Sequence, residues 1–449
     1  MKNLTIRNIA KATNGEFCGD ASLLDKEIMG VEKDSRLIKK DWLYIPFVGA
    51  RVDGHDFIPA VFEQGAAVTL SEKKLDADYP YILVESSAQA LKDIAEFYRE
   101  QLDCKIIGIT GSVGKTSTKE MIASVLEEKF SVLKTEGNYN NEIGMPLTIL
   151  RIRDEHQIAV VEMGISFFDE MTRLSKVSKP DVCVITNIGT CHLENLGDRD
   201  GVLKAKTEMF ANAKPDCFTV LNGDDDKLST ITSVQNNAPM FYGIETKRDV
   251  MAYNYESDNI KGISCTIKYF DEEFDTYIPL PGFHNMYNAL AATCIGKHFG
   301  MTIEEIDRGI RNLKSVSGRN NIFESQGMTI IDDCYNANPM SMKASISVLA
   351  NAEGRKVAVL GDMFELGDNE NELHAEVGEY INDKNIDVVV CIGKLAKNIY
   401  DKVQNSEKYY FESKDEFDYN TVLKEGDTVL VKASNGMKFR EIIASLKGE

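Results

Sequence analysis

The chain has 449 residues, more than one hydrophobic core usually serves, so we expect two or three domains. Its formal net charge of −20 argues against general binding to nucleic acid or to an anionic membrane surface, since both need a basic field. No stretch approaches the ~20 apolar residues of a membrane-spanning helix, and the amino terminus shows no secretory signal. The nine cysteines form no Cys-x-x-Cys pair, which favours reduced thiols. We therefore expect a cytoplasmic protein without membrane insertion; anionic small substrates stay compatible, because a pocket can be locally positive.

The first region, residues 1–100, contains short strands followed by a helix. Apolar, β-prone runs predict strands over 41–47, 65–70 and 81–84. A helical spacing of apolar residues predicts a helix over about 88–101. This order indicates a small α/β domain.

A glycine-rich segment follows the next apolar run, residues 105–110, and passes directly into an amphipathic helix. The segment reads Gly111-Ser112-Val113-Gly114-Lys115-Thr116. Glycines let several backbone N–H groups point at one anion, and a helix N-terminus adds its dipole. Lys115 can then reach the outer phosphates and Thr116 a magnesium ion. The sequence predicts a nucleoside triphosphate site, although Ile109 stands where the usual motif has its first glycine.

The second region, from 105 to about 316, alternates strands with helices, which predicts a mostly parallel sheet. Its expected strands are 106–110, 158–162, 182–187 and 218–222. Glu162 ends one strand and His192 follows another, so both should lie at the sheet edge that carries the phosphate loop. Either residue alone could be merely structural. Their common edge with the loop favours function, and a carboxylate suits magnesium.

The third region begins near Arg319 and again alternates strands with helices. Its expected strands are 329–332, 356–360, 388–392 and 428–431, as in a doubly wound nucleotide-binding fold. No Gly-x-Gly-x-x-Gly occurs there, so a nicotinamide cofactor has no support. Asn338 can cap a helix that begins at Pro339, and such a helix N-terminus suits a carboxylate.

Several motifs resemble those of the Mur ligases of bacterial cell-wall synthesis. In the second region they are residues 111–116, 138–146, 191–194, 205–210 and 284–292. Residues 332–339 resemble the branch that adds D-alanyl-D-alanine to UDP-N-acetylmuramoyl-tripeptide, and 34–36 and 53–57 match its UDP-sugar segments. The match covers essentially the whole chain. Val113, where the family usually has asparagine, and Ser117, where it often has threonine, depart from it.

The resemblance implies an α/β protein of three domains. A small α/β UDP-substrate domain would span 1–100, a central parallel-sheet P-loop ATPase domain 101–316, and a C-terminal Rossmann-like ligase domain 317–449. The implied activity is that of an ADP-forming amide ligase in peptidoglycan precursor synthesis. ATP converts a substrate carboxylate into an acyl phosphate, which an incoming amine attacks. We expect a cytoplasmic monomer.

The resemblance also assigns roles to individual residues. Catalytic roles fall to Lys115, His192, Lys206 and Arg319. Nucleotide contacts fall to Gly111, Ser112, Val113, Gly114, Lys115, Thr116, Asn285, Asn288, Arg319 and Asp333. Contacts with the other two substrates fall to Ser35, Arg36, Asp53, Gly54, His55, Asn141, Tyr335, Asn336 and Asn338.

Two Mg²⁺ sites follow from the same resemblance. Thr116 and Glu162 would bind one ion, and His192 would help to bind the second. Lys206 matches a lysine that the family modifies with carbon dioxide. The resulting carbamate replaces a cation by an oxygen-rich anion that can bind a metal. Without the resemblance, Lys206 would be interpreted as an exposed helix lysine.

Three alternatives remain. A sister ligase that adds a single amino acid carries a different signature at residues 335–339. A folylpolyglutamate-type ligase would begin close to its phosphate loop, whereas about 100 residues precede the loop here. A nucleotide-gated binding module without ligase chemistry would not need His192, Lys206 and Arg319 together. Lysine and diaminopimelate both stay open as the third residue of the peptide.

Overall fold

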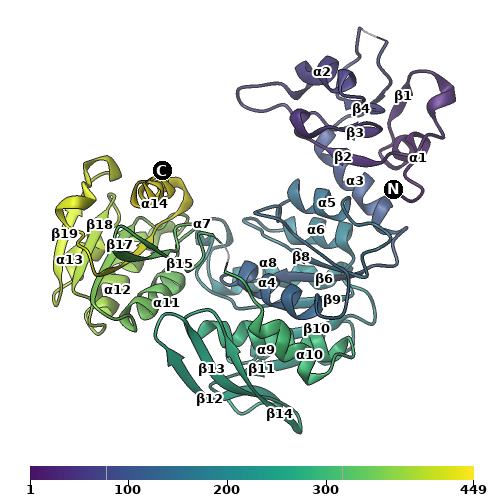
Figure 1. Cartoon of the computed structure of the whole chain (residues 1–449). Helices are drawn as coiled ribbons and strands as arrows, with labels where there is room; N and C mark the ends of the chain where they lie inside the picture. The colour runs from purple at the N-terminus through teal and green to yellow at the C-terminus, as the bar shows by residue number, and fades with distance from the viewer. Residues whose placement is uncertain (77, 316, 449) are drawn as a thin grey trace.

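The computed structural model describes residues 1–76, 78–315 and 317–448, and in it the chain forms three successive α/β regions, each with its own sheet (Figure 1). Val316, where the sequence places the boundary between the second and third domains, lies outside the described residues, as do Ala77 and Glu449. Among the helices described, none is long and apolar enough to cross a membrane.

The first region has a sheet of strand order β1-β5-β4-β3-β2. Its strands are β1 (Glu16–Cys18), β2 (Gly30–Glu32), β3 (Trp42–Tyr44), β4 (Val68–Ser71) and β5 (Tyr81–Leu83). Its helices are α1 (Ile6–Ala12), α2 (Ile58–Glu63) and α3 (Ser87–Arg99). The three predicted strands and the predicted helix are present, whereas β1 and β2 were not predicted. Only β1 runs antiparallel to its neighbour among these paired strands.

Helix α3 joins the first region to the second. Ser86 caps its N-terminus, where the side chain accepts a hydrogen bond from Gln89 N. At its other end the buried Arg99 guanidinium donates to Ser178 O at 2.8 Å and to Asp181 Oδ2 at 2.9 Å. These charge-assisted bonds fasten the end of α3 to the central region.

The second region has a larger sheet of order β14-β13-β12-β11-β10-β9-β6-β8-β7. Its strands are β6 (Lys105–Thr110), β7 (Val132–Lys134), β8 (Ile158–Glu162), β9 (Val182–Ile185), β10 (Phe218–Asn222), β11 (Met240–Gly243), β12 (Val250–Asp258), β13 (Gly262–Tyr269) and β14 (Glu272–Ile278). All pairs from β7 to β12 are parallel, and β12, β13 and β14 pair antiparallel. The four predicted strands form its parallel centre, as expected.

Helices cover both faces of this sheet. They are α4 (Lys115–Leu126), α5 (Gly144–Ile149), α6 (Glu170–Ser178), α7 (Leu193–Leu196), α8 (Arg199–Thr207), α9 (His284–His298) and α10 (Ile303–Arg311). Ile107 and Ile109 pack with α4 and α9 in one buried cluster, while Ile106 packs with α5, α6 and α8 in another. Burial on both faces explains why these strands read as continuous apolar runs. Met121, Ile122, Val125 and Leu126 lie on the buried face of α4, as predicted.

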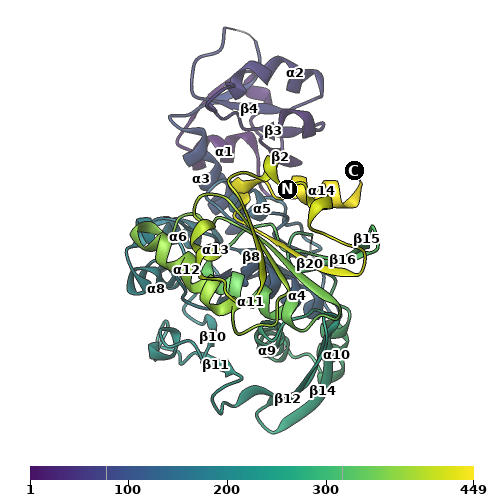
Figure 2. The same ribbon diagram turned by 90° about the vertical axis from the view of Figure 1, so that its left-hand side faces the viewer.

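The third region has a sheet of order β15-β16-β20-β17-β18-β19. Its strands are β15 (Asn321–Ser325), β16 (Met328–Asp332), β17 (Arg355–Gly361), β18 (Val388–Ile392), β19 (Glu407–Phe411) and β20 (Asp427–Lys432). Its helices are α11 (Pro339–Ala350), α12 (Glu370–Ile381), α13 (Lys397–Lys402) and α14 (Arg440–Lys447). Helices α11, α12 and α13 pack on one face and α14 on the other (Figure 2). This is the doubly wound arrangement that the sequence predicted.

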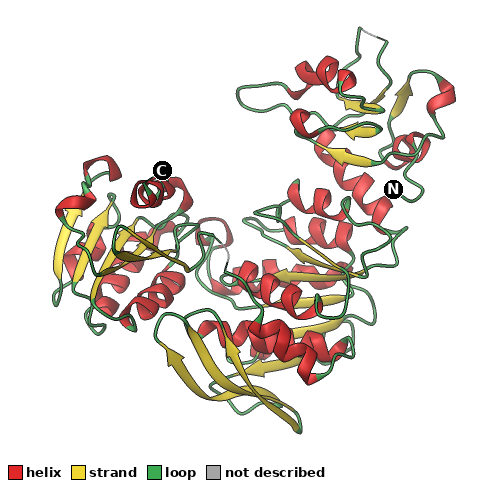
Figure 3. Cartoon of the chain, viewed as in Figure 1, coloured by secondary structure: helices red, strands yellow, loops and turns green. Residues whose placement is uncertain are grey.

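Figures 1 and 3 show the third region to the left of the central one, with the first region projecting from the top of the central region in this view. The carboxyl ends of β6, β8 and β9 lie near the third region, since the residues that follow these strands line one cavity with residues of that region.

Candidate active site

The segment between β6 and α4 has a backbone that only glycine tolerates at two positions. Gly111 has φ +152°, and a Cβ added there would clash with the Thr186 hydroxyl. Gly114 has φ +83° at the N-cap of α4, a left-handed conformation that other residues avoid. The loop therefore bends tightly enough for α4 to begin at Lys115.

The end of β9 holds this loop in place. Ser112 N donates to Asn187 O at 3.0 Å, and Val113 N donates to Asn187 Oδ1 at 2.9 Å. The Val113 carbonyl accepts from the Thr186 hydroxyl at 2.6 Å and from Asn187 Nδ2 at 2.9 Å. The Val113 backbone is thus engaged whatever its side chain, so its departure from the family pattern leaves the loop geometry intact.

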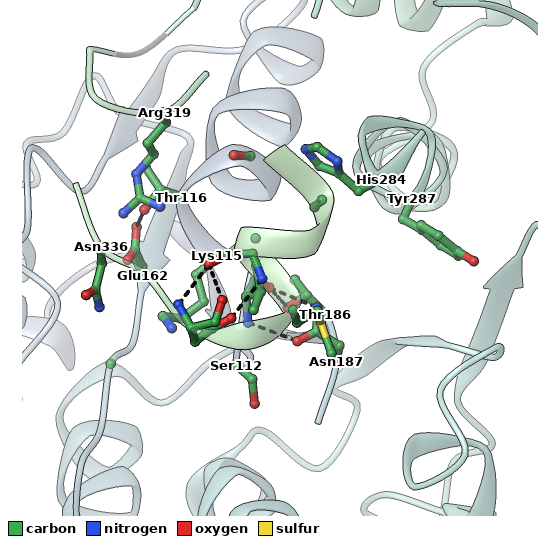
Figure 4. A pocket seen from close by; sticks show the side chains of 18 of the residues that line it. Ser112, Lys115, Thr116, Glu162, Thr186, Asn187, His284, Tyr287, Arg319 and Asn336 are labelled. Carbon is green, nitrogen blue, oxygen red and sulfur yellow. Dashed lines mark hydrogen bonds between the residues drawn. The ribbon is translucent and has the colours of Figure 1, made fainter. Parts of the chain in front are cut away.

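Lys115 lies at the first position of α4 and points back over the loop. Its Nζ donates to Gly111 O at 2.7 Å, and it forms no ion pair with a carboxylate in the described part of the chain. Figure 4 shows it beside Ser112 and Thr116, with Arg319 and Asn336 on the side of Glu162 in this view and His284 and Tyr287 on the other. Its ammonium is available to an anion at the α4 N-terminus.

Glu162 lies one strand away, at the end of β8, with only 1% of its surface exposed. Its Oε2 accepts from the Thr116 hydroxyl at 2.7 Å, and its Oε1 accepts from Asn140 Nδ2 at 2.8 Å. Lys119 Nζ lies 3.9 Å from Oε2. The juxtaposition of Thr116 and Glu162, predicted from the parallel sheet, is present.

These oxygens suit Mg²⁺ in the company of phosphates. The described residues contain no group of three or more His, Cys, Asp or Glu placed to hold a metal by themselves. Magnesium commonly binds through one or two carboxylates, substrate phosphates and water. Thr116 and Glu162 fit that donor set beside a nucleotide.

Lys119 and Thr135 support Glu162 and were not singled out from the sequence. Lys119 is 1% exposed and donates to Thr135 O at 2.6 Å, and Glu162 N donates to Thr135 Oγ1 at 3.0 Å. Lys119 lies one helical turn after Lys115, and this spacing could have indicated it. Thr135 follows a short half-buried strand and left no sequence signal.

His192 precedes α7 and faces the third region. Its backbone has φ +54°, and its Nδ1 lies 2.6 Å from Glu365 Oε2. This contact holds the pKa of Glu365 below its usual value. His192 lines the same cavity as Lys115 and Glu162, so the predicted common edge is observed.

Lys206 is buried on α8 and 1% exposed, so it is not an exposed helix lysine. Burial lowers its pKa to about 8, opposed by Cys191 and assisted by the nearby Lys115 ammonium. In the described part of the chain it pairs with no carboxylate. A buried cation without a counter-ion is costly, so this position favours the neutral amine.

Two asparagines on α9 lie on one face, as their spacing predicted. Asn288 Oδ1 accepts from the Thr118 hydroxyl at 2.7 Å, which ties α9 to α4. Asn285 Oδ1 accepts from Asn288 Nδ2 at 2.9 Å, and its own Nδ2 donates to Pro281 O at 2.8 Å. Asn288 lines the cavity, whereas Asn285 lies behind it and orients it.

The third region contributes the opposite wall. The Arg319 guanidinium lies 4.1 Å from the centre of the Tyr335 ring, just after Gly318, which has φ +76°. Asp333 forms a buried ion pair with Lys432. Lys432 also donates to Asn336 O at 3.0 Å, and no sequence pattern indicated this lysine.

Asn338 caps α11, as predicted. Its Oδ1 accepts from Ser341 N at 2.9 Å, and its own N donates to Ser341 Oγ at 3.0 Å. This reciprocal capping box fixes where α11 begins. The free N–H groups of that helix turn therefore face the cavity wall that Asn338 and Ser341 line.

One cavity of about 900 Å³ lies between the central and third regions. The predicted residues that line it are Ser112, Val113, Gly114, Lys115, Thr116, Asn141, Glu162, His192, Asn288, Arg319, Asp333, Tyr335, Asn336 and Asn338. Gly111, Lys206 and Asn285 do not line it. The lining carries eight acidic and four basic side chains, so the cavity is not a positive patch within an acidic protein.

The predicted UDP-sugar residues form a separate cluster in the first region, away from this cavity. Tyr44 OH donates to Gly54 O at 2.9 Å, and burial together with Asp34 and Asp53 raises the pKa of Tyr44 to about 12. Both predicted segments therefore meet around Tyr44. His55 and Lys73 bind the Asp53 carboxylate and hold its pKa well below the usual value.

The remaining residues of this cluster lie on short 3₁₀ turns. Ser35 and Arg36 belong to Ser35–Leu37, and Gly54 and His55 to Gly54–Phe57. The same loops expose the apolar side chains of Leu37, Val52 and Phe57. The cluster thus offers both polar and apolar contacts.

Three family models match successive parts of the chain. "Mur ligase family, catalytic domain" matches residues 27–99, "Mur ligase middle domain" residues 109–296, and "Mur ligase, glutamate ligase domain" residues 318–435.

The chain is also similar over nearly its whole length to known proteins. It is 38% identical to the UDP-N-acetylmuramoyl-tripeptide–D-alanyl-D-alanine ligase of Bacillus subtilis, over 98% of each chain. A crystal structure of MurF from Acinetobacter baumannii has a TM-score of 0.90 at 31% identity, over 99% of each chain. A MurF ligase from Thermotoga maritima in complex with ADP has a TM-score of 0.83 at 31% identity, over 94% of this chain and 97% of that one. These structures confirm the predicted fold class.

Proposed function

Since the chain belongs to the Mur ligase family, as its motifs predicted, we propose that it joins D-alanyl-D-alanine to UDP-N-acetylmuramoyl-tripeptide with conversion of ATP to ADP and phosphate. The observation that carries this proposal is the shared cavity. Lys115 lines it from the central region, and Tyr335–Asn338 line it from the third region. The phosphates of ATP and the dipeptide can therefore bind in the same cavity.

The chemistry explains why cations from two regions are needed. The terminal carboxylate of the UDP-substrate attacks the γ-phosphate of ATP, and the resulting acyl phosphate is attacked by the amine of the dipeptide. Collapse of the tetrahedral intermediate gives an amide and inorganic phosphate. Because both partners of the first step are anions, catalysis depends on positioning and on cationic screening. Lys115 screens the phosphates from the loop, and Arg319 screens them from the third region.

Thr116 and Glu162 would hold one Mg²⁺, and His192 with a carbamylated Lys206 a second. Bound magnesium supplies charge neutralisation and orientation of the phosphate oxygens. Lys119 and Asn140 keep Glu162 in place, and burial increases the share of Lys206 in the neutral form that reacts with carbon dioxide. Asn285 orients Asn288 towards the nucleotide.

The other substrates have separate places. The N-terminus of α11, capped by Asn338, suits the carboxylate of the dipeptide, with Tyr335 and Asn336 beside it. Asn141 lines the cavity near the reacting end of the UDP-substrate. Ser35, Arg36, Asp53, Gly54 and His55 hold its nucleotide end in the first region.

We also propose domains at 1–100, 101–316 and 317–449, with a cytoplasmic location that matches the proposed substrates. We also propose that the protein is a monomer. Sedimentation at working concentrations tests that last point.

One assay tests the function. ADP release is measured with the UDP-tripeptide and with D-alanyl-D-alanine, D-alanine, L-lysine or no amine. We expect release to depend on the dipeptide. Release with a single amino acid would favour a sister ligase, and nucleotide binding without any release would favour a binding module. Tripeptides ending in lysine or diaminopimelate, compared by kcat/KM, identify the third residue.

A further inference from the structure

Two residues with left-handed backbones meet where the second and third regions touch. His192 has φ +54° and Glu365 has φ +63°, and His192 Nδ1 lies 2.6 Å from Glu365 Oε2. Such conformations are costly for residues other than glycine and concentrate at functional sites. Two such conformations at one contact between distant segments indicate a functional role for this contact.

The segment just before Glu365 is held firmly by hydrogen bonds. Met363 N donates to His374 Nε2 at 2.9 Å, and Phe364 N donates to Ser434 Oγ at 2.9 Å. Asp362, three residues before Glu365, accepts from Ala396 N at 2.7 Å. These bonds anchor the loop to its own domain, so the Glu365 carboxylate is presented from a rigid base.

The opposite side of the contact is α7, which Figure 1 shows at the junction of the two regions. The turn Gly367–Asn369 packs against α7, and a Cβ added at Gly367 would lie 3.4 Å from Glu194 N. Backbone thus approaches backbone closely beside the pair. The His192–Glu365 distance is therefore set by how the third region sits on the central one.

We propose that Glu365 is a positioning residue for His192, acting from the third domain on a metal site of the central domain. The proposal rests on the function proposed above. Histidines that ligate metals usually donate their other ring N–H to a carboxylate, which fixes the tautomer and the ring orientation. His192 Nδ1 is buried and lies within 2.6 Å of Glu365 Oε2 without an aligned hydrogen bond, so a small rotation of the imidazole completes that bond and leaves the Nε2 lone pair for a divalent cation.

This arrangement couples domain position to metal binding. Glu365 leaves the contact whenever the third region moves away, because the hydrogen bonds described above anchor its loop to the third region. Arg319 comes from the same region. Docking of the third domain therefore brings Arg319 to the phosphates and Glu365 to His192 in one movement.

The test replaces Glu365 by an isosteric neutral residue and measures metal binding directly. Mn²⁺ is titrated by electron paramagnetic resonance into enzyme saturated with a non-hydrolysable ATP analogue. We expect Glu365→Gln to weaken Mn²⁺ binding at one site about 10- to 100-fold. Asp368→Asn, the same loss of charge three residues further along the loop, is the matched control and should bind Mn²⁺ like the wild type.

A double-mutant cycle separates action through His192 from a general structural effect. In a His192→Ala background, Glu365→Gln should weaken Mn²⁺ binding no further, because the group it orients is gone. An equal loss in both backgrounds would overturn the proposal. Unchanged Mn²⁺ binding in the single variant would overturn it too. Tighter Mn²⁺ binding would also overturn it, because Glu365 would then compete with the metal for His192.

The side chain of Glu365 is 56% exposed, so the glutamine variant should unfold like the wild type. Failure of the proposed function is seen separately. It would appear as wild-type enzyme that releases no ADP with the dipeptide, while the Mn²⁺ titration still reports on Glu365.

Discussion

Replacement of Lys206 by methionine should stabilise the protein while abolishing ligation. Lys206 is buried and its pKa is lowered from 10.5 to about 8. At pH 7 an amine of that pKa is roughly one-tenth neutral, against about one part in 3,000 for an ordinary lysine. Only the neutral amine reacts with carbon dioxide, so burial prepares Lys206 for carbamylation at a cost in stability.

The cost follows from the same shift. The difference between 10.5 and about 8, at about 1.4 kcal/mol per pKa unit, corresponds to about 3 kcal/mol. Because the folded state binds this proton less tightly than the unfolded state, the cost is complete below pH 8. It disappears as the pH rises from about 8 to 10.5. Lys206→Met should therefore exceed the wild type in stability at pH 7, with the difference closing towards pH 10.5.

Unfolding midpoints in buffer free of carbon dioxide measure this difference. Added bicarbonate should raise the wild-type midpoint, since a carbamate forms only on the folded protein, and should leave Lys206→Met unchanged. Lys204→Met, on the exposed side of the same helix, is the matched control and should change neither stability nor activity appreciably.

Activity completes the test. Lys206→Ala should be nearly inactive, and a small carboxylate such as acetate should restore part of its rate by entering the vacated space. Lys206→Arg should stay inactive, because it keeps a positive charge where an anion is required. Near wild-type ligation by Lys206→Arg without bicarbonate, or a wild-type midpoint that ignores bicarbonate, would refute the reasoning.

Three further substitutions test other parts of the site. Lys115→Ala should reduce kcat by about 10²- to 10³-fold with a normal unfolding transition, since it removes a cation aimed at the transferred phosphate; near wild-type turnover would exclude the phosphate-loop role. Arg319→Ala should lower kcat far more than it weakens binding of the UDP-substrate, measured by titration; equal losses would contradict a role confined to closure. Asn338→Ala should cost about 1 kcal/mol in stability and raise the KM for the dipeptide, and unaltered urea unfolding would show that the cap contributes nothing.

The sequence predicted the central parallel strands of the second and third regions well because each is buried on both faces, whereas β2, β7, β11 and β19 were missed. The strands β8, β10 and β18 begin and end where their apolar runs do. The antiparallel strands β12, β13 and β14 were missed, since the exposed half of β12 at residues 254–258 carries no apolar run. Edge strands such as β15 are half-buried and give the same weak signal.

The candidate site was likewise predicted only in part from the sequence. The phosphate loop was predicted because its chemistry lies in six consecutive residues. Thr186 and Asn187, which hold that loop, act through contacts 73 and 74 residues away, and no local pattern indicates them. Lys206 stands in a charged helix, and its burial depends on packing that periodicity does not reveal.

The electrostatics of the cavity explain how an acidic protein can handle anionic substrates. Two of the four basic residues of the lining are neutralised by neighbouring carboxylates: Arg199 pairs with Asp226, and Lys432 pairs with Asp333. Within the described residues, Lys115 donates only to a backbone carbonyl, and Arg319 lies over an aromatic ring. These two cations are thus the ones free to meet phosphate.

They come from different regions, so a triphosphate brings both together only when the third region is docked. Two monovalent cations do not balance a triphosphate and a carboxylate inside a lining rich in acidic groups. The remaining negative charge of the substrates must be screened by divalent cations. The Glu162 carboxylate favours substrate binding only when such a cation is present. For the proposed function, the acidic lining would therefore make phosphoryl transfer depend on divalent cations and on docking of the third region together.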